Sequence, residues 1–301
     1  MVSGFLALWQ KKLFFLSFHP FSLSLHFNCL DMKELFTRSI SGLVFGIVVV
    51  ACIFLSPWAL AVLLLIVVSI GTFEMCRLHG ITDPLHLGIV EALITGSFVF
   101  GGCVALGLLS CRWLLLETLF MSSPFLFALF SKPLRHDTIF SCCYASISFL
   151  TVPSLMMLFM YRNDLFGAMA GPWLLMLVFC LLWVNDIFAY LTGKLLGKHK
   201  LCERISPGKT IEGSLGGLLF TVLAMALFSH YADWLSLKAA VGMAAIAVVF
   251  GTLGDLSESM LKRQAGVKDS GRLIPGHGGI LDRFDSVMFS VPFIIVYLLL
   301  L

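Results

Sequence analysis

Charged residues are scarce in this chain of 301 residues. They make up 12% of it, against about 25% in a typical soluble domain. Hydrophobic residues make up 59%, and the mean hydropathy is +0.99. This small number of charges cannot cover a surface that faces water. Most of the surface must therefore face lipid. The composition therefore predicts an all-α fold, a polytopic bundle of membrane helices.

Paired cysteine motifs are also absent. The chain has nine cysteines, an odd number, and no CxxC pair. This excludes the usual zinc modules and argues against a disulfide framework, so we interpret the cysteines as small buried hydrophobic residues in a reducing compartment. The net charge of +3 is too small to indicate a nucleic-acid partner.

The N-terminus lacks the features of a signal peptide. Its apolar run is interrupted by Pro20, His26 and Asn28, and no A-x-A-like cleavage site follows. Met32 then opens a short basic head that leads into an apolar segment. We hypothesise that residues 1–31 are a non-essential N-terminal extension; an additional interfacial segment is the alternative.

Apolar windows long enough to span a bilayer recur along the rest of the chain, since about 20 residues suffice. They divide it into N-terminal transmembrane helices over 32–190 and a C-terminal catalytic region over 191–301 with two polar loops. We predict about nine transmembrane helices, at 39–56, 58–76, 87–109, 113–131, 138–160, 172–190, 213–231, 238–254 and 286–301. The first two are separated only by Ser56 and Pro57, which must form a tight connection.

The distribution of lysine and arginine supports this number. With nine helices, 17 of the 20 basic residues lie on one side, and the other three are Arg112, Arg162 and Lys238. The positive-inside rule then predicts a cytoplasmic N-terminus, both long polar loops on the cytoplasmic side, and Leu301 on the far side.

The second polar loop, residues 255–285, holds five of the seventeen acidic residues and five of the twenty basic ones. Asp255 and Glu258 have the spacing of one helical face, as have Asp282 and Asp285. Two facing helices would present these carboxylates to one or two cations, and carboxylates bind Mg²⁺ while lysine and arginine bind phosphate. The loop therefore indicates phosphoryl or nucleotidyl chemistry at a membrane surface. A merely solvated charged loop is the alternative, which the density of acid, base and glycine disfavours.

Glycines separate the two halves of this loop. Residues 275–279 read PGHGG, a turn with little side-chain bulk that allows phosphate to approach the backbone. His277 could be a ligand, an acid or a hydrogen-bonding turn residue. Zinc is disfavoured because no second histidine or cysteine lies nearby in the sequence.

The first polar loop follows Asp186, which lies in or at the edge of a predicted helix. A carboxylate at membrane depth is costly and indicates function; a solvated residue at the interface is the alternative. Tyr190, four residues on, could orient Asp186. Lys198 and Lys200 could anchor the chain at the interface or bind a lipid phosphate.

Residues 207–210 read PGKT but do not form a Walker A loop, because Glu203 stands where glycine is required and no strand is expected before it. We instead expect a helix start, with Ser206 as the cap and Pro207 in the first position. Lys209, Thr210 and the helix amides would then meet phosphate. The GxxxG pair Gly213 and Gly217 predicts close helix packing, and Gly193 and Gly197 form a second such pair.

Residues 259–285 resemble the defining motif of the phosphatidate cytidylyltransferases, also called CDP-diacylglycerol synthases. The spacing is unbroken, and the matching positions are Ser259, Lys262, Arg263, Lys268, Asp269, His277, Gly278, Gly279, Asp282, Arg283 and Asp285. Residues 186–213 are similar to this family as well. Together the two runs cover about the last third of the chain.

The resemblance implies Mg²⁺-dependent transfer of a cytidylyl group from CTP to phosphatidate, which gives CDP-diacylglycerol and pyrophosphate. Because members of this family have paired metal sites, a second, monovalent cation beside Mg²⁺ is an open alternative. The implied metal ligands are Asp255, Asp282 and Asp285. The implied catalytic positions are these three with Lys262, Arg263, Lys268, Asp269, His277 and Arg283. The candidates for contact with a substrate phosphate are Lys209, Lys262, Arg263, Lys268 and Arg283. The candidate substrate-binding residues are Asp186, Lys198, Lys200, Ser206, Lys209, Thr210, Gly278 and Gly279.

The same resemblance implies a homodimer in a bacterial plasma membrane, with the active site on the cytoplasmic face and no nucleic acid as partner. Two alternative functions remain open. One is a CTP-dependent lipid-alcohol kinase similar to dolichol kinase; the other is a transporter with Asp186 on an ion path, which the lack of inverted repeats disfavours. The CDP-alcohol transferases are excluded because the D-G-x-x-A-R pattern is absent.

Overall fold

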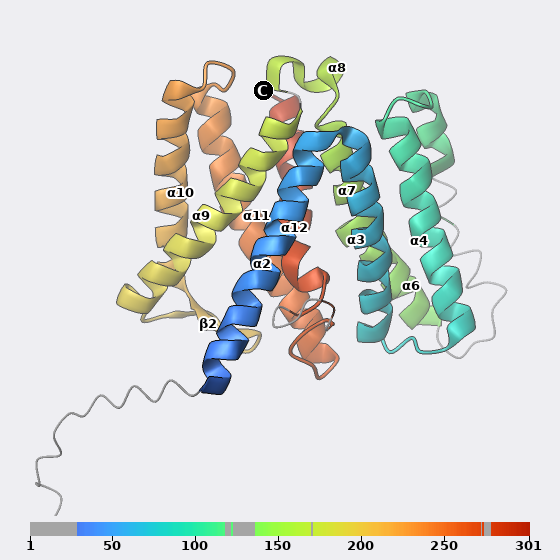
Figure 1. Cartoon of the computed structure of the whole chain (residues 1–301), viewed down its shortest axis with the longest axis horizontal. Coiled ribbons are helices and arrows are strands. Elements are labelled where there is room, and N and C mark those ends of the chain that lie inside the picture. Colours follow the sequence, from blue (N-terminus) through green and yellow to red (C-terminus); the bar gives the residue numbers. More distant parts are fainter. Residues whose placement is uncertain (1–28, 118–121, 123–135, 170, 272, 274–277) are drawn as a thin grey trace, which may run out of the picture. The chain divides into compact units, whose positions relative to one another are not determined.

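The computed structural model describes residues 29–117, 122, 136–169, 171–271, 273 and 278–301. It divides into two units, residues 1–37 and 38–301, and the architecture below is that of the second (Figure 1). Residues 1–28 of the proposed extension lie outside the described residues.

Helices account for nearly all of the described chain. They are α2 (Cys29–Leu55), α3 (Pro57–Leu78), α4 (Pro84–Ala105), α6 (His136–Ser146), α7 (Val152–Phe159), α8 (Asn163–Phe166), α9 (Pro172–Leu196), α10 (Ile211–Tyr231), α11 (Leu237–Gln264) and α12 (Leu281–Leu299). A π-helical turn, η3 (Ile147–Thr151), joins α6 to α7, and short 3₁₀ turns are η2 (Cys111–Trp113) and η4 (Gly167–Met169). The strands are β1 (Lys200–Cys202) and β2 (Ser206–Thr210).

Six helical segments in the described residues are long and apolar enough to cross a membrane: Pro57–Leu78, Pro84–Ala105, Thr138–Phe159, Pro172–Leu196, Ile211–Tyr231 and Leu237–Gln264. A shorter apolar helix covers Ile40–Leu55. The predicted class, an all-α bundle of membrane helices, is therefore confirmed. The number nine stays a prediction, because most of the segment 113–131 lies outside the described residues.

The predicted tight connection between the first two helices is confirmed. Helix α2 ends at Leu55 and α3 begins at Pro57. Ser56 caps α3, since its Oγ accepts a hydrogen bond from the Ala59 N–H at 3.1 Å. Proline follows in the first helical position, where its missing N–H costs nothing.

A β-hairpin lies between α9 and α10, and two predictions were wrong there. Strands β1 and β2 pair antiparallel, with Lys200 opposite Thr210, so Ser206 and Pro207 belong to a strand and do not start a helix. Helix α10 begins four residues later, at Ile211, and Thr210 is its cap, with Oγ1 accepting from the Gly213 N–H at 3.1 Å. A strand does precede Pro207, so the rejection of a Walker A loop rests on Glu203 alone.

Helices α9 and α10 pack with their backbones in close contact, as the GxxxG pair predicted. A Cβ atom added at Gly213 would lie 2.7 Å from the Ala189 carbonyl oxygen and 3.1 Å from the Cα of Gly193. Only glycine allows this approach. The close packing holds the hairpin against the end of α9.

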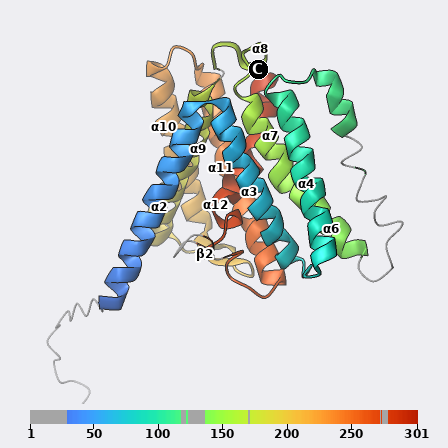
Figure 2. The same ribbon diagram turned by 45° about the vertical axis from the view of Figure 1, so that its right-hand side comes forward.

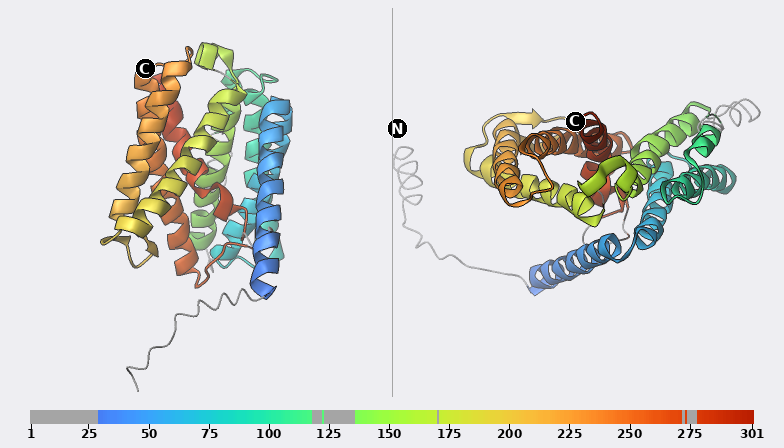
Figure 3. Two further views of the ribbon diagram at one scale, coloured as in Figure 1. Left: turned by 60° about the vertical axis from the view of Figure 1, so that its left-hand side comes forward. Right: turned by 90° about the horizontal axis from the view of Figure 1, so that it is seen from above.

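Helix α12 lies at the centre of the second unit, between α11 on one side and α7 on the other (Figures 1, 2 and 3). Its inner face is buried along Val287, Met288, Val291 and Ile294. Near its first turn, the Phe284 ring contacts the rings of Phe45 and Phe179 edge to face, at centroid distances of 5.7 Å and 6.4 Å. The end of α12 that carries Asp282 and Asp285 is thus held by apolar packing.

The two polar loops meet at the same end of the bundle (Figure 1). Arg263, in the last turn of α11, donates from Nε to the Ile205 carbonyl in the hairpin at 3.4 Å. Lys209 of β2 forms an ion pair with Asp255 of α11. This arrangement agrees with the prediction that both loops lie on one side of the membrane.

Candidate active site

Four carboxylates border one cavity at this end of the bundle. Asp186 comes from α9, Asp255 from α11, and Asp282 and Asp285 from the first turns of α12. The cavity has a volume of about 400 Å³, and its other walls include Phe45, Val49, Phe179, Leu182, Arg283 and Ser286. The structure therefore brings together the three predicted metal ligands and Asp186, which are up to 99 residues apart in the sequence.

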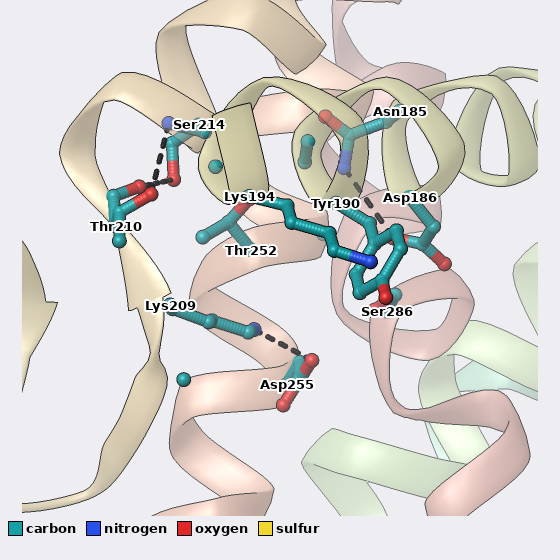
Figure 4. A pocket seen from close by; sticks show the side chains of 15 residues that line it. Asn185, Asp186, Tyr190, Lys194, Lys209, Thr210, Ser214, Thr252, Asp255 and Ser286 are labelled. Atoms are coloured by element: carbon teal, nitrogen blue, oxygen red, sulfur yellow. Dashed lines mark hydrogen bonds and ion pairs between the residues drawn. The ribbon is translucent and has the colours of Figure 1, made fainter. Parts of the chain in front are cut away.

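A second cavity, of about 570 Å³, adjoins the first and shares Asp186, Asp255 and Ser286 with it. Figure 4 shows that basic side chains enter it from two elements, Lys209 from β2 and Lys194 from α9. The Lys209 Nζ lies 2.5 Å from Oδ2 of Asp255. This cavity thus combines carboxylates with ammonium groups and the backbone of the hairpin, a suitable setting for phosphate.

Lys194 was not predicted. Its Nζ lies 5.8 Å from the centre of the Tyr190 ring, one turn earlier on the exposed face of α9, a cation–π geometry. Tyr190 had been expected to orient Asp186, but the contact that the structure shows for it is the one with Lys194. Asp186 instead accepts a hydrogen bond from the Asn185 amide at 3.5 Å.

Lys262 is enclosed by carboxylates. Its Nζ lies 2.7 Å from Oε2 of Glu258 and 2.6 Å from Oδ1 of Asp282. The exposed fractions of the side chains are 11% for Lys262, 1% for Glu258 and 8% for Asp282. The ammonium group is therefore paired with two buried acids, whereas the sequence had suggested contact with a substrate phosphate.

Asp282 also organises the glycine-rich loop before α12. Its Oδ2 accepts hydrogen bonds from the Gly279 N–H at 2.7 Å and from the N–H and Oγ of Ser270, both at 3.1 Å. Gly278 has a φ of +83°, which glycine adopts without strain. A Cβ at Gly278 would also come within 2.5 Å of Oδ2 of Asp282. The last two residues of the predicted turn, Gly278 and Gly279, therefore lie directly against this aspartate.

Arg283 apart, the other predicted residues that the structure describes lie outside the carboxylate cavity. Lys268 and Asp269 border a third cavity of about 640 Å³, together with Arg77 and Ser270. Lys198 and Lys200 are exposed in and beside the hairpin, where the Lys200 Nζ donates to the Pro207 carbonyl at 2.7 Å. Ser206 lies in β2, Thr210 borders the second cavity, and His277 lies outside the described residues.

The carboxylate cavity suits a divalent cation. Within the described residues, no group of three histidine, cysteine, aspartate or glutamate side chains is close enough to hold a metal by itself. Lysines pair with Asp255 and Asp282. Asp186 and Asp285 border the same cavity without an ion-pair partner among those residues. Mg²⁺ typically binds one or two carboxylates and takes its remaining ligands from water and substrate phosphate, so this donor set fits it.

Sequence reasoning missed Glu74 of α3. Its side chain is buried, with 3% of the residue exposed, and it contacts the loop before α12. Glu74 is the single acidic residue in the predicted helix 58–76. The rule that drew attention to Asp186, that a carboxylate at membrane depth indicates function, would have identified Glu74 too.

Comparison with known proteins gives consistent matches. A family model described as "Cytidylyltransferase family" matches residues 36–301. Proteins named phosphatidate cytidylyltransferase are similar to part of the chain. The one from Staphylococcus aureus (strain COL) is 49% identical over 122 residues, which is 40% of this chain and 47% of that protein. The one from Staphylococcus haemolyticus (strain JCSC1435) is 41% identical over 162 residues, 52% of this chain and 58% of that protein. The chain thus spans about half the length of the curated relatives it matches.

Proposed function

Because the chain belongs to the cytidylyltransferase family, we propose that it transfers the cytidylyl group of CTP to phosphatidate and forms CDP-diacylglycerol and pyrophosphate. The observation that carries the proposal is the pair of adjoining cavities, where four carboxylates and two lysines meet at one end of an apolar helix bundle. The names of the matched relatives support the same reaction.

The chemistry requires little of a general base. A phosphate oxygen of phosphatidate, already anionic, forms a bond to the α-phosphorus of CTP. The bond from that phosphorus to the bridging oxygen breaks, and its electron pair leaves with pyrophosphate. The main barrier is the approach of two anions and the charge on the leaving group, which cationic groups stabilise.

In our proposal, the residues of the two cavities have separate roles in binding phosphate, holding the metal and positioning α12. Lys209 exchanges its contact with Asp255 for a phosphate oxygen, and the hairpin backbone beside it lines the phosphate path. Asp285, and Asp255 once Lys209 has left it, are the ligands that would hold Mg²⁺, and Asp186 borders the same cavity. Asp282 keeps the end of α12 in place and borders the same cavity. When bound, Mg²⁺ supplies positive charge to the reacting phosphates and the departing pyrophosphate; a second, monovalent cation stays open.

The reaction assigns a direction to the bundle. CTP is dissolved in the cytoplasm, so we place the end of the bundle that carries the hairpin and the loop 265–280 on the cytoplasmic side of a bacterial plasma membrane. We propose in addition that the protein is a homodimer. Nine transmembrane helices would put Leu301 on the other side. Phosphatidate reaches the cavities from the bilayer, beside the lipid-facing side of α9.

Product analysis tests the proposed reaction. Purified full-length protein in detergent is incubated with phosphatidate, Mg²⁺ and CTP labelled either in cytidine or in the γ-phosphate. Label from cytidine should enter the lipid and label from the γ-phosphate should appear in pyrophosphate. A lipid labelled from the γ-phosphate alone would identify a lipid kinase and reject the proposal.

Membrane orientation is tested with single cysteines in a cysteine-free background. Glu203→Cys and Val267→Cys lie in the two polar loops, and Leu301→Cys is at the C-terminus. An impermeant thiol reagent added from the cytoplasmic side should label the first two positions and leave the third unlabelled, because 17 of the 20 basic residues lie on that side in the nine-helix arrangement. Labelling of the loops from outside would overturn the orientation.

Lys194→Ala should raise the KM for phosphatidate about 10-fold, the cost of one hydrogen bond to a charged group, while the KM for CTP changes little. Lys194 lies on the exposed face of α9 and borders the second cavity, where a lysine side chain can extend to a lipid headgroup. Initial rates over both substrate concentrations measure this, and Lys194→Arg serves as the charge-preserving control. Equal changes in both KM values would contradict a role in lipid binding.

A further inference from the structure

Glu74 connects two parts of the molecule that are far apart in sequence. It lies on α3, yet its carboxylate reaches the start of α12. Oε1 accepts a hydrogen bond from the Ile280 N–H at 3.0 Å. Oε2 accepts from the Leu281 N–H at 3.0 Å and from the Ser270 hydroxyl at 2.8 Å. Three donors therefore converge on one buried carboxylate.

Helix α12 needs such a group. Its N-cap residue, Ile280, has no side-chain hydrogen bond to offer, and the first N–H groups of any helix lack partners within the helix. Ile280 and Leu281 are both buried, so water cannot take this place without cost. The carboxylate of Glu74 supplies the missing acceptor and places negative charge at the positive end of the helix dipole.

Two glycines make room for the carboxylate. A Cβ atom at Gly271 would lie 2.9 Å from Cδ of Glu74 and would overlap its Oε1, and a Cβ at Gly279 would overlap both carboxylate oxygens. The loop backbone therefore lies directly against Glu74. The absence of side chains at these two positions is explained by the buried acid as well as by the approach of a substrate.

The contact continues to the carboxylate cavity. The Ser270 hydroxyl bridges Glu74 and Oδ2 of Asp282, and Oδ1 of Asp282 meets Lys262. A chain of polar contacts thus runs from α3 through the loop to α12 and α11. Asp282 and Asp285 lie within the first five residues of the helix that Glu74 caps.

We infer that Glu74 is a positioning residue of the active site: it caps α12 from α3 and, with Ser270, holds Asp282 and Asp285 where the cavity requires them. Glu74 itself contacts no reacting atom. The inference rests on the proposed function for its effect on turnover. Its effect on the loop does not depend on any reaction and is measured separately.

The first measurement is amide hydrogen exchange in the full-length protein in detergent. Glu74→Ala leaves the Ile280 and Leu281 amides without their acceptor, so a peptide covering 278–284 should exchange at least about 10-fold faster, which corresponds to the loss of one buried hydrogen bond. Glu74→Gln should have a smaller effect, because one amide oxygen remains. Glu91→Gln is the matched control, since Glu91 is a partly buried acid on the neighbouring helix α4 whose carboxylate has a buried oxygen without a hydrogen-bond partner.

The second measurement is turnover. Glu74→Ala should lower kcat about 10- to 100-fold, while the KM values for CTP and phosphatidate stay within about 3-fold, because substrate-binding groups are retained but the carboxylates are misplaced. A loss that appeared only as a lower yield of folded protein, with normal kcat per folded molecule, would show a purely structural role and reject the inference.

The third measurement couples Glu74 to the loop. Gly271→Ala should slow turnover in the parent protein because the new methyl group meets Glu74. In the Glu74→Ala background the same change should cost at least about 3-fold less, since the nearest obstacle is gone and the Cα of Gly279, at 3.2 Å, is the next. Independent, multiplicative effects together with unchanged exchange at 278–284 would overturn the inference. If the parent protein shows no transferase activity, the proposed function fails, and exchange in the same variants still decides the role of Glu74.

Discussion

Replacing Asp285 with asparagine is expected to lower kcat by about three orders of magnitude, because a metal held by this carboxylate supplies several kcal/mol of charge stabilisation. The fold should survive the change. Among the residues that the structure describes, the Asp285 side chain accepts one hydrogen bond, from the Ser286 N–H at 2.6 Å, and an asparagine oxygen can accept it as well. Initial rates at saturating CTP and phosphatidate, with the melting temperature of the same sample, measure both expectations.

Asp233→Asn is the matched control for this variant. Asp233 is exposed in the connection between α10 and α11, at the end of α10 opposite the hairpin, and its loss should leave kcat unchanged. An Asp285→Asn enzyme that retains kcat within about 3-fold of the parent would exclude Asp285 as a ligand. The cation would then have to be held by Asp186 and Asp255, which border the same cavity.

Lys262→Met is expected to destabilise the protein by about 3–5 kcal/mol, the usual cost of removing one partner from a buried ion pair. Methionine fills a similar volume, but it leaves Glu258 and Asp282 without their shared cation. Oε1 of Glu258 is already buried without a hydrogen-bond partner, so we expect the Glu258 side chain to be the first to move when the ammonium group is lost. Thermal unfolding in detergent, with the fraction of folded protein at each temperature, measures the loss.

The cost of Lys262→Met should shrink when Glu258→Gln is introduced with it, because one of the two acids left without the ammonium group is then replaced by an amide. Lys238→Met is the control, since Lys238 lies in the first turn of α11, far along the helix from Lys262. An unchanged melting temperature for Lys262→Met would mean that its ammonium is not needed between the two acids. That result would favour the prediction that Lys262 contacts a substrate phosphate.

Much of the fold was predictable because membrane helices are specified locally. Ser56 and Pro57 end one apolar run and start the next, and the structure breaks its helices at that point. The hairpin was missed because its pairing of Lys200 with Thr210 leaves no hydrophobic pattern: both strands are short and largely polar. Proline at position 207 suggested a first helical turn, while Thr210 made the better cap.

The candidate site was predictable only as a set of residues. Spacing in the sequence placed Asp282 and Asp285 on one helical face, and Asp255 and Glu258 on another. It could not show that Asp282 and Glu258 would share Lys262, because that depends on how α12 packs against α11. Nor could it show Glu74 beside Ser270, which is 196 residues away. Such contacts are set by tertiary packing and leave no local pattern.

The length of α11 has a consequence for the depth of the chemistry in the bilayer. Its 28 residues extend about 42 Å at 1.5 Å per residue, whereas the hydrocarbon core is about 30 Å thick. If α11 enters the hydrocarbon at its first turn, where Lys238 lies, then Asp255 falls about 27 Å along the axis, just short of the far boundary. Glu258 and Lys262 stand at and beyond that boundary. A thicker bilayer would draw the carboxylates below the plane of the phosphates, and a thinner one would lift them above it, so membrane thickness itself becomes a variable of the reaction.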